Sequence, residues 1–64
     1  MDEQQEPILK YFSYEHLPEK LKIQSRRFHD LAQAIVDDIP RSPERTVALR
    51  KLLESKDAAV RAAM

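Results

Sequence analysis

The residue types best suited to chemistry are cations and aromatic rings, and they alternate in one short segment. Its members are Lys10, Tyr11, Phe12, Tyr14 and His16. Rings stack on nucleobases and cations meet phosphates, and stacking contributes roughly 1–3 kcal/mol per base. The alternative is that a ring such as Phe12 seals one end of a small core, while tyrosines keep an exposed edge. The segment predicts a nucleotide contact if its rings remain accessible.

A second group of candidate residues falls in the segment 22–27, where Lys22, Arg26 and Arg27 place three cations within six residues. These cations either contact phosphate groups or form a solvated basic face. Ser25 interrupts an apolar stripe in the same segment. Its hydroxyl either bonds a carbonyl of its own helix or lines a pocket at an interface.

A third group, Arg45 and Thr46, falls at the start of a predicted helix, where backbone N–H groups attract anions. Both side chains would add donors there, so they are candidate ligand contacts. The structural alternative for Arg45 is a salt bridge with Asp37 or Asp38, just before it in the chain. Lys56 lies on an otherwise apolar helix face. Its stem either snorkels along an interface or its charge meets an anion.

Catalysis and metal binding have little support in the pattern. His16 and His29 are thirteen residues apart, which is not a metal-ligand spacing on one helix. Asp37 and Asp38 are neighbours and point about 100° apart on a helix, so they do not form a catalytic dyad. The chain has no glycine and no cysteine, which excludes Gly-rich phosphate loops and Cys-type zinc sites. We expect no catalytic residue, no metal and no cofactor, and a protein that is not an enzyme.

Prolines divide the chain into the elements that must position these residues. Residues 1–6 carry no apolar pattern and are expected to be flexible; residues 7–64 form the domain. Helix one is predicted over residues 18–38 and helix two over 43–62, with Ser42 as N-cap. The apolar stripe of helix one comprises Leu21, Phe28, Leu31, Ala32, Ile35 and Ile39. The predicted fold is all-α: an antiparallel two-helix hairpin preceded by a short helical, aromatic lead-in.

The composition limits the classes of function. Sixty-four residues allow one small domain, and the 11 basic residues balance the 11 acidic ones. Zero net charge argues against DNA or RNA polymers, whose binding requires many neutralised phosphates. Charges interrupt every apolar run, so no membrane span is expected, and we expect a soluble intracellular protein. A lone hairpin leaves apolar faces uncovered, which predicts self-association through helix packing.

Several stretches of the sequence resemble one known family. They are Tyr11-Phe12, His16-Leu17-Pro18, residues 21–32 (LKIQSRRFHDLA) and, as the most specific, residues 44–62 (ERTVALRKLLESKDAAVRA). The chain resembles the bacteriophage helical-hairpin proteins of the anti-CBASS and anti-Thoeris type, which sequester cyclic nucleotide signals. The resemblance implies a homo-oligomer, a hexamer, that acts in the host bacterial cytoplasm. It also implies that cyclic dinucleotides, and in some members cyclic trinucleotides, are bound between protomers and not cleaved.

The resemblance also assigns site residues. Tyr11 occupies the place of the aromatic residue that stacks on bases, and the phosphate-contacting position of the first helix falls near Ser25 and Arg26. Arg45 and Thr46 match the region used for trinucleotides. The full set of expected ligand-binding residues is Tyr11, Phe12, His16, Lys22, Ser25, Arg26, Arg45 and Thr46.

Other interpretations remain open from the sequence. A small helical adaptor that binds other proteins, with no nucleotide ligand, would account for the wide apolar face and the neutral charge. A helix-turn-helix DNA-binding protein is disfavoured by the two long, nearly equal helices and by the charge balance. The sequence does not indicate which bases or linkages a ligand would carry, or whether cyclic ADP-ribose signals bind.

Overall fold

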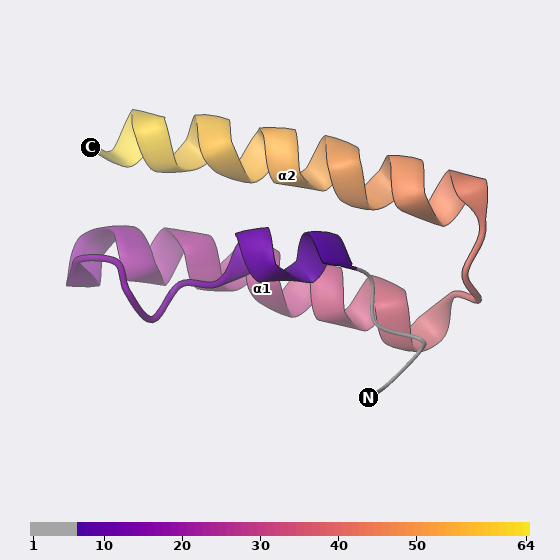
Figure 1. Ribbon diagram of the computed structural model, residues 1–64. Helices are drawn as coiled ribbons and strands as arrows, with labels where there is room; N and C mark the ends of the chain where they lie inside the picture. The colour runs from indigo at the N-terminus through magenta and orange to yellow at the C-terminus, as the bar shows by residue number, and fades with distance from the viewer. Residues whose placement is uncertain (1–6) are drawn as a thin grey trace.

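The protein is a helical hairpin with a short helix laid across it, as the computed structural model shows for residues 7–64 (Figure 1). The 3-10 helix η1 (Pro7–Phe12) leads through a loop into α1 (Glu19–Asp38), and α2 (Pro43–Ala63) returns antiparallel to α1. No strand occurs in this part of the chain. The predicted all-α hairpin is confirmed. The flexible segment predicted at 1–6 lies outside the described residues.

The start of α1 differs slightly from the prediction. Pro18 was expected inside the first turn but is the N-cap, with an extended backbone (φ −57°, ψ 154°). Proline lacks an N–H, yet its carbonyl accepts the first helical bonds, from the amides of Leu21 (3.0 Å) and Lys22 (2.8 Å). The helix therefore begins one residue later than expected.

Two proline junctions shape the turn between the long helices. Ile39 precedes Pro40 and is extended (φ −116°, ψ 127°), as a residue before proline prefers, so α1 ends there. Ser42 caps α2: its Oγ accepts a hydrogen bond from the Arg45 amide at 3.1 Å, with Pro43 in the first turn. The predicted cap is confirmed. Helix α2 extends to Ala63, one residue beyond the expected end.

Arg45 joins the two long helices at the turn. Its side chain leaves the first turn of α2, is 2% exposed, and donates from Nη1 to the carbonyls of Val36 (3.2 Å) and Ile39 (2.7 Å). The last carbonyls of a helix lack intrahelical partners, and that end carries partial negative charge. A guanidinium there satisfies the carbonyls and complements the charge.

The core lies where η1, α1 and α2 meet. Among residues 7–64, four apolar side chains are buried: Phe12, Ala32, Val36 and Leu49. A ring of partly buried residues packs around them, namely Ile8, Leu9, Phe28, Ile35, Leu52 and Leu53. Phe12 therefore seals the core, the packing alternative given for it above. Helix η1 contacts both long helices, and Phe12 is its fully buried residue.

The predicted stripe of α1 was wrong at two positions. Leu31 and Ile39 are exposed, and Val36 takes the core position instead. Successive helical residues point about 100° apart, so Leu31 and Ala32 do not share one narrow face. The core face contains Ser25, Ala32 and Val36, at intervals of seven and four residues.

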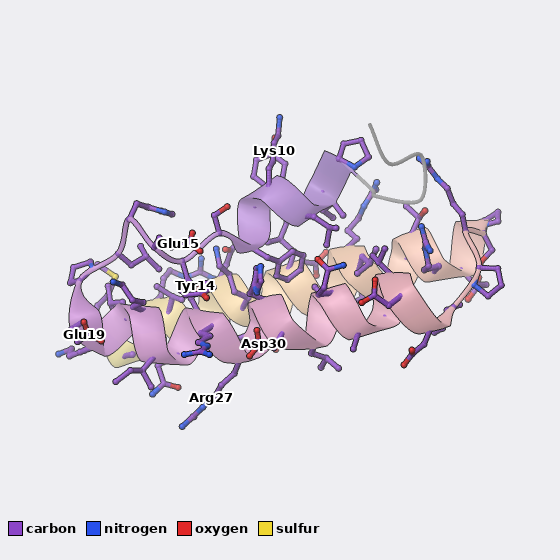
Figure 2. All side chains as sticks on the ribbon, turned by 90° about the horizontal axis from the view of Figure 1, so that it is seen from below. Lys10, Tyr14, Glu15, Glu19, Arg27 and Asp30 are labelled. Carbon is purple, nitrogen blue, oxygen red and sulfur yellow. The ribbon has the colours of Figure 1, made fainter. Side chains whose placement is uncertain are left out.

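Helix η1 packs against one face of the hairpin, and the extents along the principal axes are 34 × 22 × 16 Å (Figure 2). Among residues 7–64, no further element covers the opposite face of the two long helices. Large apolar side chains consequently remain on the surface, and they are Ile23, Leu31, Ile39, Val47 and Met64. Neither α1 nor α2 combines the length and apolar character that crossing a bilayer requires.

Arg45→Met should destabilise the protein by about 2–3 kcal/mol, because it leaves two carbonyls of α1 without their charged donor. Urea unfolding followed by circular dichroism measures the change. Arg50→Met, at an exposed position of the same helix, is the matched control and should stay within about 0.5 kcal/mol of the parent. Equal stability of the two variants would contradict the role given to Arg45.

Candidate functional site

Tyr11 presents an accessible aromatic ring from η1. The residue is 56% exposed, whereas Phe12, next to it, is fully buried. The Lys10 ammonium lies 5.2 Å from the centroid of the Tyr11 ring, a distance at which a cation is attracted to the ring face. Lys10 itself extends away from the long helices (Figure 2). The pair offers a stacking surface with a positive charge beside it.

Lys56 holds the backbone of Tyr11 from the opposite end of the sequence. Its Nζ donates to the Tyr11 carbonyl at 2.9 Å and lies 3.5 Å from Asp57 Oδ1. The Lys56 side chain is 14% exposed. The sequence suggested snorkelling or an anion contact, and it missed this carbonyl because 45 residues separate the partners. The apolar face on which Lys56 falls was the available signal that its ammonium needs a partner inside the fold.

The cations of α1 differ in their exposure and in the direction of their side chains. Arg26 is exposed and its Nε lies 3.8 Å from Asp30 Oδ2, with both side chains more than 60% exposed. Lys22 is half-buried. An exposed ion pair contributes little stability, so the Arg26 guanidinium exchanges partners easily. Arg27, the next residue, projects from the side of α1 opposite η1 (Figure 2).

A Tyr14–His29 contact ties the loop after η1 to the middle of α1. The two rings meet edge to face, with centroids 5.0 Å apart and an interplanar angle of 69°. His29 Nδ1 lies 3.2 Å from Asp30 Oδ1. The sequence argued only against a metal-ligand role for His29, and nothing in the spacing indicates that it meets Tyr14. The contact fixes the loop that leads from Tyr11 toward Lys22.

Ser25 is fully buried on the core face of α1. Among residues 7–64, its Oγ has no hydrogen-bond partner, so the bond to a helix carbonyl, one of the two alternatives given above, is not formed. In the protomer its hydroxyl does not reach the surface. Ser25 thus acts as a small residue in the packing, and Arg26 is the accessible member of this pair.

The remaining predicted site residues are dispersed. His16 is exposed in the loop before α1. The Thr46 hydroxyl donates to the Ser42 carbonyl at 3.2 Å. Arg45 is buried, and its guanidinium bonds the carbonyls of Val36 and Ile39. Tyr11 lies beside Lys56 of α2, whose Nζ bonds its carbonyl. Lys56 is eleven residues from Arg45, or about 16 Å along the helix. Within a single protomer, Tyr11 is therefore far from Arg45 and Thr46.

No protein-family model matches the chain, and no curated protein or solved structure matches it either. Within residues 7–64, no group of three or more His, Cys, Asp or Glu side chains lies close enough together to hold a metal ion. The chemistry of the site is therefore argued from its own residues.

Ser25→Ala should leave the protein as stable as the parent or stabilise it by about 1 kcal/mol. The substitution removes a buried hydroxyl without a partner, and alanine is the better helix former. Thermal unfolding measures the effect, with Ser55→Ala, at an exposed position of α2, as a control for helix propensity alone. A loss of more than 1 kcal/mol relative to this control would show that the Ser25 hydroxyl is bonded in the folded protein.

Proposed function

We propose that this protein binds and sequesters cyclic oligonucleotide second messengers, cyclic dinucleotides first and cyclic trinucleotides second. The observation that carries the proposal is the Tyr11 ring, exposed on a tethered backbone with the Lys10 ammonium 5.2 Å from its centroid. A stacked base needs such a fixed, accessible ring. The resemblance of residues 44–62 to phage hairpin proteins supports the same ligand class.

The cations available to a ligand are few and favour a compact one. Lys10 lies beside the Tyr11 ring, and Lys22 and Arg26 add positive charge on α1, while the chain as a whole is neutral. A cyclic dinucleotide carries two phosphates and needs only a few cations, whereas a nucleic acid polymer gains affinity from many. The site therefore suits a small anion with bases on either side of its phosphates.

Self-association would complete both the apolar surface and the site. The side chains of Ile23, Leu31 and Val47 are exposed on the two long helices, and covering such residues drives association. We propose a homo-oligomer, a hexamer by the resemblance, with ligand held between protomers. Arg45 and Thr46 stay within the proposal only as part of a second, trinucleotide site near the turn.

Sequestration leaves the ligand chemically unchanged. In this proposal the protein is not an enzyme and requires no cofactor. It acts in the cytoplasm of a bacterial host, where holding the signal starves an immune effector for the benefit of a phage. Recovery of intact ligand after heating the complex supports this mechanism, and recovery of a hydrolysed product contradicts it.

Tyr11→Ala should weaken binding of a cyclic dinucleotide by about tenfold or more, as expected for loss of one stacked base. Isothermal calorimetry with 3′,3′-cyclic GMP-AMP, cyclic di-AMP and a cyclic triadenylate measures the affinities. Tyr11→Phe keeps the ring and should bind like the parent. Arg26→Ala should also lose affinity, while Arg27→Ala, whose side chain projects from the side of α1 opposite η1 (Figure 2), should not.

The second candidate function is a helical adaptor that binds another protein and no nucleotide. The exposed apolar residues of α1 and α2 favour it. It predicts no heat and no shift in melting temperature with any of the three cyclic nucleotides, and none with cyclic ADP-ribose isomers. It also predicts that the double variant Tyr11→Ala, Arg26→Ala still binds the partner protein as the parent does.

A further inference from the structure

Helix η1 depends on the rest of the protein for its conformation. It has six residues in a 3-10 arrangement, and so short a helix is not stable by itself in water. Two contacts anchor its C-terminal end: the Phe12 side chain is buried in the core, and the Tyr11 carbonyl accepts the hydrogen bond from Lys56. These are contacts of adjacent residues with different elements.

The Lys56 bond supplies a donor to a backbone carbonyl at the end of η1 that has no partner within the helix. The last carbonyls of a helix have no intrahelical donor. The amide of Ser13 reaches the Lys10 carbonyl at 3.4 Å, and Lys56 Nζ reaches the next carbonyl, that of Tyr11, at 2.9 Å. A cation at this end also complements the negative end of the helix dipole.

The Lys56 side chain is largely covered, although its bond to the Tyr11 carbonyl lies at the surface. Lysine is among the residues least often buried, because its ammonium loses hydration. Here the Lys56 side chain is 14% exposed, and its ammonium has the Tyr11 carbonyl and the Asp57 carboxylate as partners. The placement of this ammonium is therefore defined by the fold and in turn constrains the peptide it bonds.

Together the two anchors set the direction of the Tyr11 ring. Successive residues of a 3-10 helix point about 120° apart. With Phe12 held in the core and the Tyr11 carbonyl held by Lys56, η1 cannot rotate about its axis without losing one contact. The Tyr11 side chain is thereby kept on the outside, where it is 56% exposed beside Lys10.

We propose that Lys56 is the positioning residue of the binding site: it touches no ligand, and it preorganises Tyr11 for stacking. The inference rests on the proposed function for its binding consequence, although the effect on Tyr11 exists without a ligand. Fixing a contact residue before binding lowers the entropy lost on association. A direct contact between Lys56 and a ligand phosphate is disfavoured because Nζ already has the Tyr11 carbonyl and the Asp57 carboxylate as partners.

The test compares three proteins in a Tyr14→Phe background, where Tyr11 is the single tyrosine of a chain without tryptophan. Lys56→Met removes the donor and keeps the length of the side chain, and Lys56→Arg restores a donor. Lys51→Met, on an exposed part of α2, is the matched control. Time-resolved tyrosine anisotropy reports the motion of Tyr11 without ligand, calorimetry with a cyclic dinucleotide reports affinity, and circular dichroism reports folding.

In Lys56→Met, we expect a larger fast component in the anisotropy decay of Tyr11 and an affinity loss of about tenfold, the scale of one charged hydrogen bond. Lys56→Arg should recover both, and Lys51→Met should change neither. If Lys56→Met does not fold, Lys56→Gln takes its place: the amide is one bond too short for the 2.9 Å contact and should give an intermediate change of both readouts.

Unchanged Tyr11 motion in a folded Lys56→Met or Lys56→Gln protein overturns the proposal. Increased motion with unchanged affinity overturns it too, since the ring would then not need positioning. A loss of cyclic dinucleotide affinity without a change in Tyr11 motion would overturn it as well, because Lys56 would then contact the ligand directly. If Tyr11 loosens but the parent protein binds no cyclic nucleotide, the proposed function fails and the structural link between Lys56 and Tyr11 stands.

Discussion

The bond between Arg45 and the end of α1 is the interaction on which the arrangement of this protein depends. The hairpin has few fully buried apolar side chains, so packing alone specifies the alignment of its two helices weakly. Arg45 adds a directional constraint, because Nη1 reaches two carbonyls of the other helix at 3.2 and 2.7 Å. Once the turn end is fixed, the antiparallel path of α2 brings Lys56 to Tyr11.

The cations divide into two groups with different tasks. Arg45 and Lys56 are largely buried and bond backbone carbonyls, so they hold elements together. Lys10 and Arg26 are exposed and available to an anion. This division means that a neutral chain with 11 basic residues has fewer cations for ligands than its composition suggests. A small anion with few phosphates fits that supply better than a polymer does.

The sequence predicted the parts of the fold that depend on local signals. Prolines and the Ser42 cap placed the turn within a residue, and helical periodicity gave both long helices. The pattern failed where tertiary contact decides: Leu31 shares the apolar character of its neighbours but faces outward. In the candidate site, exposure of Tyr11 was predictable from residue type. The carbonyl partners of Arg45 and Lys56 were not, since a lysine bonding a backbone 45 residues away leaves no mark in spacing.

We propose that this hairpin holds a cyclic oligonucleotide between copies of itself without cleaving it. Native mass spectrometry of the full chain with a panel of cyclic di- and trinucleotides tests this most directly, because it reports the number of protomers, the number of ligands and the mass of each ligand together. The account predicts a homo-oligomer that retains ligand of unaltered mass. A monomer, or an oligomer that carries no ligand from the panel, would contradict it.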